Sequence, residues 1–165
     1  MDVGIEALAT TDIDVACQWL SDVSINRWLT SEWRGRAVTP PVLAAALRGG
    51  RSRFFMVRAD GVRVGLVVLS EIDSHDKVAM VWYLLGDREQ QGQGVTTRAV
   101  GALVRFAFEE FGLRSVYAWI ASKNVASRRV LEQNGFREIG TMRSATTVDG
   151  AVDDRVYFDI VSDVR

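Results

Sequence analysis

The sequence predicts a single α/β domain built around a mixed β-sheet. Three observations lead to this fold class. The chain has 165 residues, which is the length of one domain. β-branched apolar runs in its middle are separated by hairpin signals. Its second half alternates strand-like runs with amphipathic helical segments. We therefore treat residues 1–165 as one domain.

Composition excludes several classes of protein. The chain is 48% hydrophobic with a net charge of −1 and a pI near 5.9, so it is neither disordered nor a strongly basic nucleic-acid binder. One cysteine, Cys17, and one histidine, His75, cannot form a disulfide or a Cys/His zinc cluster, and we expect no metal. The first residues lack a signal-peptide pattern, and no apolar run approaches a membrane span. We expect a cytoplasmic protein without a membrane partner.

The segment before the two prolines at 40–41 is predicted to be helical. Asp12 is a residue type that caps helices, and apolar residues then recur at helical spacing. These residues are Ile13, Ala16, Cys17 and Leu20. A shorter apolar piece follows at 25–29, and 42–47 predicts a short helix that ends at the glycines 49–50.

Three strands are predicted in the middle of the chain. Residues 54–59 and 62–69 are rich in β-branched and aromatic side chains and flank a hairpin signal at 60–61. A loop at 73–77 leads to 78–85, a continuous apolar run that is typical of a strand buried on both faces. The three strands form a meander.

Two helices and a strand follow. The first helix has one apolar face, and Gly112 is placed to end it. Its apolar residues are Val100, Leu103, Val104, Ala107, Phe108 and Phe111. A strand at 115–120 precedes a second helix, which Asn124 caps and Gly135 ends.

The chain ends in two predicted strands, 136–142 and 155–161, joined around Asp149-Gly150. The order is helices, three strands, helix, strand, helix and two strands. This order indicates a mixed sheet.

The most informative segment is QQGQGVTTRAV, residues 90–100, between the buried strand and the long helix. Gly92 and Gly94 let backbone N–H groups turn toward one point. The helix that follows adds free N–H groups and the positive end of its dipole. Such a loop suits a phosphate or a pyrophosphate.

Four interpretations of this loop compete. A P-loop is excluded because no Gly-Lys-Ser/Thr follows. A Rossmann loop is nearer, but Thr97 stands where its third glycine belongs, and the strand at 115–120 ends without an acidic residue. A loop for the pyrophosphate of an acyl-CoA and a plain glycine turn are the other two.

A second motif, NVASRRVLEQNGF at 124–136, accompanies the glycine loop. Together the two motifs resemble the GNAT acetyltransferase superfamily in its RimJ/RimL-like branch. The similarity runs from about Phe54 to the C-terminus and extends to WLSDVSINRWL near the N-terminus. It implies a mostly antiparallel sheet of six or seven strands flanked by helices, and acetyl-CoA as the cosubstrate.

The resemblance also implies a set of CoA-binding residues. Loop residues would wrap the pyrophosphate: Gln91, Gly92, Gln93, Gly94, Val95 and Thr96. Pantetheine would lie between the diverging strands at 78–85 and 115–120. Backbone groups near Leu84 and Leu85 would bond it, and a main-chain N–H there would stabilise the thioester oxyanion.

Two residues at the start of the second helix carry further implied roles. Asn124 corresponds to the asparagine that contacts the pantetheine arm. Ser127 corresponds to the serine near the sulfur and would relay a proton to the leaving thiolate. Without the family pattern, both are ordinary residues of a helix N-terminus.

The general base is where this chain departs from the family. The strand at 78–85 has no acidic residue, and Thr146 stands where RimL-like sequences carry a glutamate. Glu71 is the first candidate base, and Asp73 and His75 are the others. A water chain is the alternative.

The predicted function is acetyl transfer to a primary amine, first of all a protein N-terminal α-amine. Trp28, Trp33 and Trp82 are predicted to wall the acceptor pocket, with packing in the core as their alternative. The other functions considered are acetylation of a small amine (an amino sugar, an aminoglycoside-like antibiotic or a polyamine) and acyl-CoA binding without catalysis. The resemblance is compatible with a homodimer.

Overall fold

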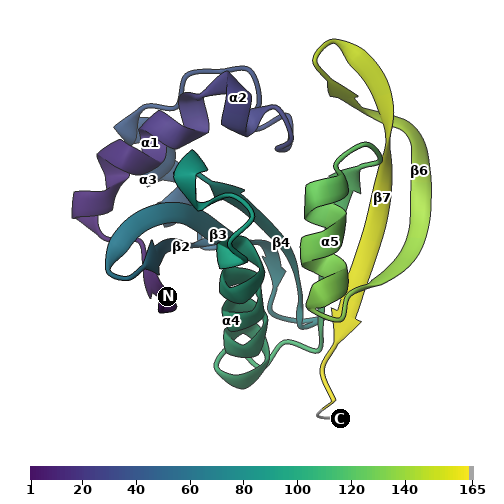
Figure 1. Ribbon diagram of the computed structural model, residues 1–165. Coiled ribbons are helices and arrows are strands. Elements are labelled where there is room, and N and C mark those ends of the chain that lie inside the picture. The colour runs from purple at the N-terminus through teal and green to yellow at the C-terminus, as the bar shows by residue number, and fades with distance from the viewer. Residues whose placement is uncertain (164–165) are drawn as a thin grey trace.

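The computed structural model describes residues 1–163, which form one seven-stranded sheet with helices on both faces (Figure 1). The elements in chain order are β1 (Val3–Ala7), η1 (Thr10–Asp12), α1 (Ile13–Ser21), α2 (Val23–Asn26), α3 (Pro40–Arg48), β2 (Arg53–Ala59), β3 (Val62–Asp73), β4 (Val78–Leu85), η2 (Arg88–Gln90), α4 (Val95–Glu109), β5 (Ser115–Ala121), α5 (Val125–Gln133), β6 (Arg137–Val148) and β7 (Ala151–Val161). The strand order is β1-β2-β3-β4-β5-β7-β6. All neighbouring strands are antiparallel except β4 and β5. The predicted fold class is confirmed.

The structure adds one strand and lengthens others. The sequence analysis missed β1, whose five residues contain Gly4 and Glu6 and pair with β2. Strands β3, β6 and β7 are longer than predicted. Register shifts in β3 after Ser70 and in β6 after Met142 interrupt the apolar alternation there, so the pattern ends before the strand does.

Asp12 precedes α1 as predicted, but its side chain does not cap that helix. It is 1% exposed, and its carboxylate accepts from the N–H of Ala9 at 3.0 Å and from Nε of Arg63 at 2.6 Å. The residue ties η1 to β3 instead.

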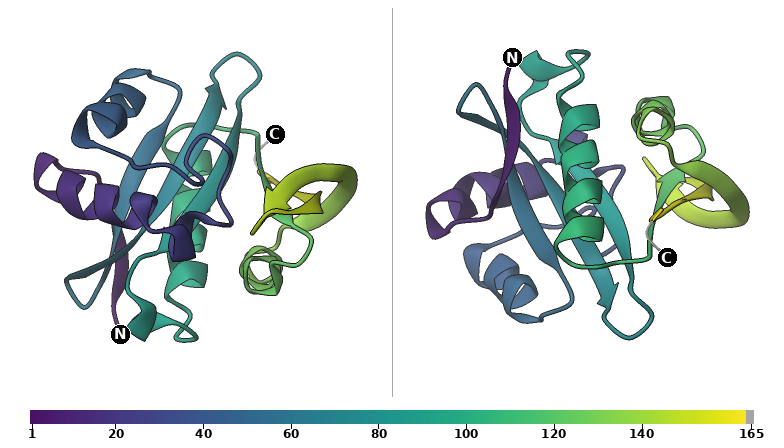
Figure 2. Two further views of the ribbon diagram at one scale, coloured as in Figure 1. Left: turned by 90° about the horizontal axis from the view of Figure 1, so that it is seen from above. Right: turned by 90° about the horizontal axis from the view of Figure 1, so that it is seen from below.

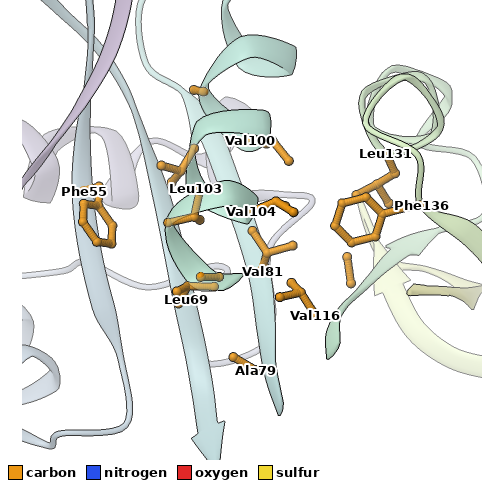
Figure 3. Packing of buried hydrophobic residues seen from close by; sticks show 14 of the residues in the cluster. Phe55, Leu69, Ala79, Val81, Val100, Leu103, Val104, Val116, Leu131 and Phe136 are labelled. Carbon is orange, nitrogen blue, oxygen red and sulfur yellow. The ribbon is translucent and has the colours of Figure 1, made fainter. Parts of the chain in front are cut away.

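Helices cover both faces of the sheet, as the two views of Figure 2 show, and each face has its own hydrophobic cluster. On one face α4 packs on the central strands, where Leu103 and Val104 approach Val81 and Val116 (Figure 3). On the other face, helices α1 and α3 cover β2, β3 and the end of β4. The sheet therefore separates two sides of the molecule.

Helices α4 and α5 are held together by a close contact. A Cβ on Gly101 would lie 2.7 Å from Oδ1 of Asn134, so only glycine fits there without a shift. Nδ2 of Asn134 donates to the carbonyls of Thr97 and Val130 at 3.0 and 2.8 Å. This contact fixes α5 relative to the start of α4.

None of the helices within residues 1–163 combines the length and the apolar character that a membrane crossing needs.

We predict that Leu103→Ala lowers the free energy of unfolding by about 2–5 kcal/mol, because Leu103 is fully buried between α4 and the sheet and the change leaves a cavity. Urea denaturation measures the loss. The matched control is Arg105→Ala on the exposed face of α4, which we expect to change stability by about 0.5 kcal/mol or less. Equal effects of the two substitutions would contradict the packing described here.

Candidate functional site

Strands β4 and β5 part after a short parallel contact. They pair only at Val78↔Ser115, Ala79↔Val116 and Met80↔Tyr117. Beyond Met80, β4 stays paired with β3, and β5 stays paired with β7. One edge of β4 therefore lacks a hydrogen-bonding strand from Val81 onward. The predicted divergence of these two strands is confirmed.

The hydrogen-bond pattern decides which backbone groups face this gap. The N–H of Gly86 donates to the carbonyl of Val64 at 2.8 Å. In an antiparallel pair, residues alternate between bonding to the partner and pointing away from it. Leu84 therefore bonds to β3, whereas Tyr83 and Leu85 direct their N–H and C=O groups into the gap.

The gap holds a cleft with a volume of about 50 Å³ that is open to solvent. The lining residues come from the segment after α2, from β4, from β5 and from the start of α5. They are Trp28, Leu29, Thr30, Met80, Val81, Trp82, Tyr83, Ala118, Trp119, Ile120, Asn124 and Ser127. None of these side chains is a carboxylate, a histidine, a lysine or an arginine.

The glycine loop presents free backbone amides at the start of α4. Gly92 and Gly94 have φ of 75° and 73°, values that L side chains rarely adopt. No acceptor within residues 1–163 receives the N–H groups of Gly92, Gly94, Val95 or Thr96. A Cβ on Gly92 would meet no atom within 4 Å. The open space above free amides at the N-terminus of a 15-residue helix is suited to an anion.

The other predicted loop residues contribute through different groups. The Gln91 and Gln93 amides bond within the loop, and the Gln93 side chain donates to the carbonyl of Glu89 at 2.8 Å. The Val95 side chain is 1% exposed and packs in the core, so only its backbone can reach a ligand. Sequence analysis missed Arg98, which donates to the carbonyl of Gln93 at 3.4 Å and adds positive charge at the loop.

The end of β4 packs beside the start of α4 with a narrow gap between them. Leu84 and Leu85 line it from the strand, and Val95 and Thr96 line it from the helix. The structure thus brings the predicted strand residues and the predicted loop residues together.

Asn124 and Ser127 lie at the start of α5 and line the cleft. Oδ1 of Asn124 accepts from the N–H of Ser127 at 3.1 Å, which is a helix cap. The Tyr83 hydroxyl donates to the carbonyl of Ser127 at 3.2 Å. No described residue bonds to the hydroxyl of Ser127, so this group is available to a ligand.

Sequence analysis also missed Tyr83 and Trp119, although both line the cleft. Tyr83 crosses from β4 to α5. Burial raises the pKa of Tyr83 well above its usual value, so its hydroxyl stays protonated and remains a donor. The only sequence signal for either residue was its place on a strand next to the predicted divergence.

The three predicted acceptor tryptophans divide into two groups. Trp28 and Trp82 line the cleft. Trp33 is 4% exposed and packs on Phe54 and Trp82, with ring centroids 5.9 and 5.8 Å apart. Its predicted role as a wall is therefore corrected: it supports Trp82 from the core.

The candidate bases lie outside the cleft. Glu71 has a φ of 50° in the bulge of β3, and its carboxylate accepts a hydrogen bond from the Tyr117 hydroxyl. The carboxylate of Asp73 accepts from the amides of His75 and Asp76, so these residues form the β3–β4 turn. None of the three side chains lines the cleft, and the Glu71 carboxylate is bonded to Tyr117, so we withdraw Glu71 as the base.

Asp153 organises the loop that precedes α5. It is 7% exposed and accepts from the Ser122 hydroxyl at 2.5 Å and from the Lys123 N–H at 3.3 Å. The bond from Ser122 is the main cause of a lowered Asp153 pKa, and the bonds from Asp154 and Lys123 lower it further against the effect of burial. The carboxylate is therefore a structural anion that positions the approach to Asn124.

Within residues 1–163, no group of three or more His, Cys, Asp or Glu side chains is arranged to hold a metal ion.

Comparisons with known proteins agree on one family. The acetyltransferase (GNAT) domain matches residues 2–137. The putative ribosomal N-acetyltransferase YdaF of Bacillus subtilis (strain 168) is 34% identical over 102 residues, which are 62% of this chain and 55% of YdaF. The chain thus spans little more than half the length of this relative.

Two solved structures share the fold. The RimL ribosomal L7/L12 alpha-N-protein acetyltransferase in complex with coenzyme A superposes with a TM-score of 0.86 at 19% identity, covering 99% of this chain and 96% of RimL. The spermidine N-acetyltransferase of Vibrio cholerae in complex with CoA and spermine gives a TM-score of 0.85 at 21% identity, covering 96% and 95%. At these identities the likeness shows a common fold.

We predict that Asp153→Asn lowers the free energy of unfolding at pH 7 by about 1–3 kcal/mol, because hydrogen bonds to a buried charge are lost. The lowered pKa means that this stabilisation is complete above the ordinary value of 3.8 and is lost as the pH falls through the lowered pKa. Urea denaturation should show the same difference at pH 7 and pH 5 and a smaller one below 3.8. A difference that grows in acid would contradict this assignment.

Proposed function

This chain belongs to the acetyltransferase (GNAT) domain family, and on that premise we propose that it transfers the acetyl group of acetyl-CoA to a primary amine. The first acceptor class we propose is the α-amino group of a protein N-terminus. The amine would attack the thioester directly, in a ternary complex.

The unpaired edge of β4 is the observation that carries this proposal. It offers the N–H and C=O groups of Tyr83 and Leu85, and its far end meets the free amides of the glycine loop. A long ligand with an anionic end and an amide-containing arm can bond to both. Acetyl-CoA has this chemistry, with its diphosphate and its pantetheine.

Each group then has a proposed task. The amides of Gly92 and Gly94–Thr96 would bind the diphosphate, and the Leu85 backbone would bind the pantetheine arm. Tyr83 lines the cleft itself, so its N–H is the proposed donor to the thioester oxygen, which gains negative charge during attack. Asn124 would hold the arm from α5.

Acetyl-CoA would supply an activated acyl group. As the amine nitrogen bonds to the carbonyl carbon, the amine loses a proton to water and the carbon–sulfur bond breaks. The Ser127 hydroxyl would give a proton to the leaving thiolate and regain one from water, since nothing in the described chain occupies that hydroxyl. Tyr83 would act through its bond to the Ser127 carbonyl.

The lack of a base in the cleft favours an α-amine as the acceptor. An α-amino group has a pKa near ~8, whereas a lysine side chain has one near ~10.4. The first is partly deprotonated at neutral pH and needs only water as its base. No carboxylate or histidine lines the cleft, so the site fits an α-amine better than a lysine side chain, because the α-amine loses its proton more readily. The relative YdaF, named a putative ribosomal N-acetyltransferase, also supports this choice.

A small amine is the second acceptor class. A polyamine is the less favoured member of this class, because a polycation needs carboxylates and none lines the cleft. The homodimer and the cytoplasmic location stay predictions.

We predict that Gly94→Trp abolishes acetyl-CoA binding in isothermal titration calorimetry. The new side chain would fill the space above the loop amides. Gly112→Trp is the matched control, because Gly112 also has a positive φ and open surroundings but lies beyond the other end of α4. The control should bind normally. If both variants bind acetyl-CoA like the original chain, the loop is not the binding site.

We predict that Ser127→Ala lowers kcat for a peptide α-amine by about 10–100-fold, the range for loss of a positioned proton donor, and leaves the KM for acetyl-CoA within about twofold. Steady-state release of CoA measures both constants. Ser74→Ala in the exposed β3–β4 turn is the control. Full activity of the Ser127 variant would remove the relay role. Tight acetyl-CoA binding without turnover of any amine by the original chain would instead support a binding module.

A further inference from the structure

Arg34 and Arg155 lie near the lining of the cleft and have no carboxylate partner within residues 1–163. No ion pair within residues 1–163 includes Arg34 or Arg155. Both side chains are half-buried. Neither charge is neutralised by a carboxylate of the described residues, so both are available to pair with an anion from outside the chain.

Arg155 lies directly against the cleft wall. Its guanidinium carbon is 4.1 Å from the ring centroid of Trp119, which lines the cleft. Nε of Arg155 is buried and has no hydrogen-bond partner. Stacking uses the face of the guanidinium. Its two Nη groups have no acceptor within residues 1–163 and, unlike Nε, are not buried, so they can bind a carboxylate or a phosphate in a bidentate manner.

Arg34 reaches the same face of the C-terminal strands from the segment after α2. Its Nη1 donates to Oγ1 of Thr146 at 3.1 Å and to the carbonyl of Thr147. Thr146 pairs with Asp153, which is two residues from Arg155 on β7. Thr146 stands where the resemblance led us to expect a glutamate, so a neutral acceptor bonded to an arginine has taken the place of an acid.

The acids nearby are already bonded. Glu71 accepts from Tyr117, Asp153 accepts from Ser122 and Lys123, and Asp149 pairs with Arg27 at 2.5 Å. The Arg27 guanidinium stacks on Trp28, 4.7 Å from its ring centroid, but Asp149 neutralises its charge. Arg34 and Arg155 are therefore the cations near the aromatic lining that no carboxylate of residues 1–163 pairs with.

We propose that the acceptor carries an anionic group close to its amine, and that Arg155, together with Arg34, binds this group. The preferred acceptor is then an N-terminal segment rich in Asp or Glu. Arg155 is a specificity-determining residue in this proposal and takes no part in the proton transfers. The inference rests on the proposed acetyltransferase function and narrows its substrate class.

The test compares matched acceptors by kcat/KM. Three C-terminally amidated peptides, Ser-Glu-Glu, Ser-Gln-Gln and Ser-Lys-Lys, differ only in charge. Glucosamine 6-phosphate and glucosamine test whether a phosphate on a small amine serves instead of peptide carboxylates, and spermidine tests a polycation. We expect the acidic peptide to exceed the basic one by at least about tenfold, the scale of one charge-assisted contact.

Variants separate specificity from a structural role. Arg155→Met should reduce the preference for the acidic peptide about tenfold, whereas turnover of the basic peptide should hold or rise. Arg155→Lys should recover part of the preference. Arg105→Met on the exposed face of α4 is the control and should leave the preference for the acidic peptide unchanged. If Arg155 had only a structural role, its substitution would lower kcat/KM for all acceptors to the same extent.

Equal turnover of the three peptides, a preference for the basic peptide or spermidine, or an unchanged preference in Arg155→Met would each overturn the inference and leave the acetyltransferase function standing. A phosphate preference without a carboxylate preference would replace the peptide with a small anionic amine. No turnover of any acceptor would overturn the inference together with the proposed function.

Discussion

The rest of the structure depends on the point at which the hydrogen bonding between β4 and β5 stops. Strands β4 and β5 pair at only three positions, up to Met80↔Tyr117, and then each continues with its other neighbour. Backbone N–H and C=O groups that lack a partner strand need another partner. The open edge of β4 therefore accounts for the cleft between β4 and β5 and for the unpaired backbone groups along it.

Parting strands need other contacts to hold the two halves of the sheet. Tyr83 spans the gap from β4 to α5 with a bond to Ser127, and Asn134 closes the contact between α4 and α5 through Gly101. On the opposite side, Arg27 and Arg34 join the segment after α2 to the β6–β7 hairpin. These side-chain contacts connect the two halves of the sheet where main-chain bonds between β4 and β5 are lacking.

The electrostatics of the cleft differ along its length. Free amides and the start of α4 give the loop end a positive potential for an anion. The middle is apolar and aromatic, with no ionisable side chain other than Tyr83, whose raised pKa keeps it neutral. The acceptor side is backed by arginine, in particular Arg155. A site of this kind can hold an activated acyl group away from strong bases and depends on an amine that loses its proton readily.

The sequence by itself determined the elements whose signals are local. Amphipathic spacing placed α4, the glycine signals placed the loop and the hairpins, and residues 78–85 appeared with the bounds of β4. Only the tertiary structure decided that Trp33 is core, that Glu71 bonds to Tyr117 and does not line the cleft, and that Tyr83 and Arg155 lie beside it. The physical reason is that spacing along a chain fixes which face of an element a residue occupies, whereas bulges, strand divergence and side-chain reach fix what that face meets.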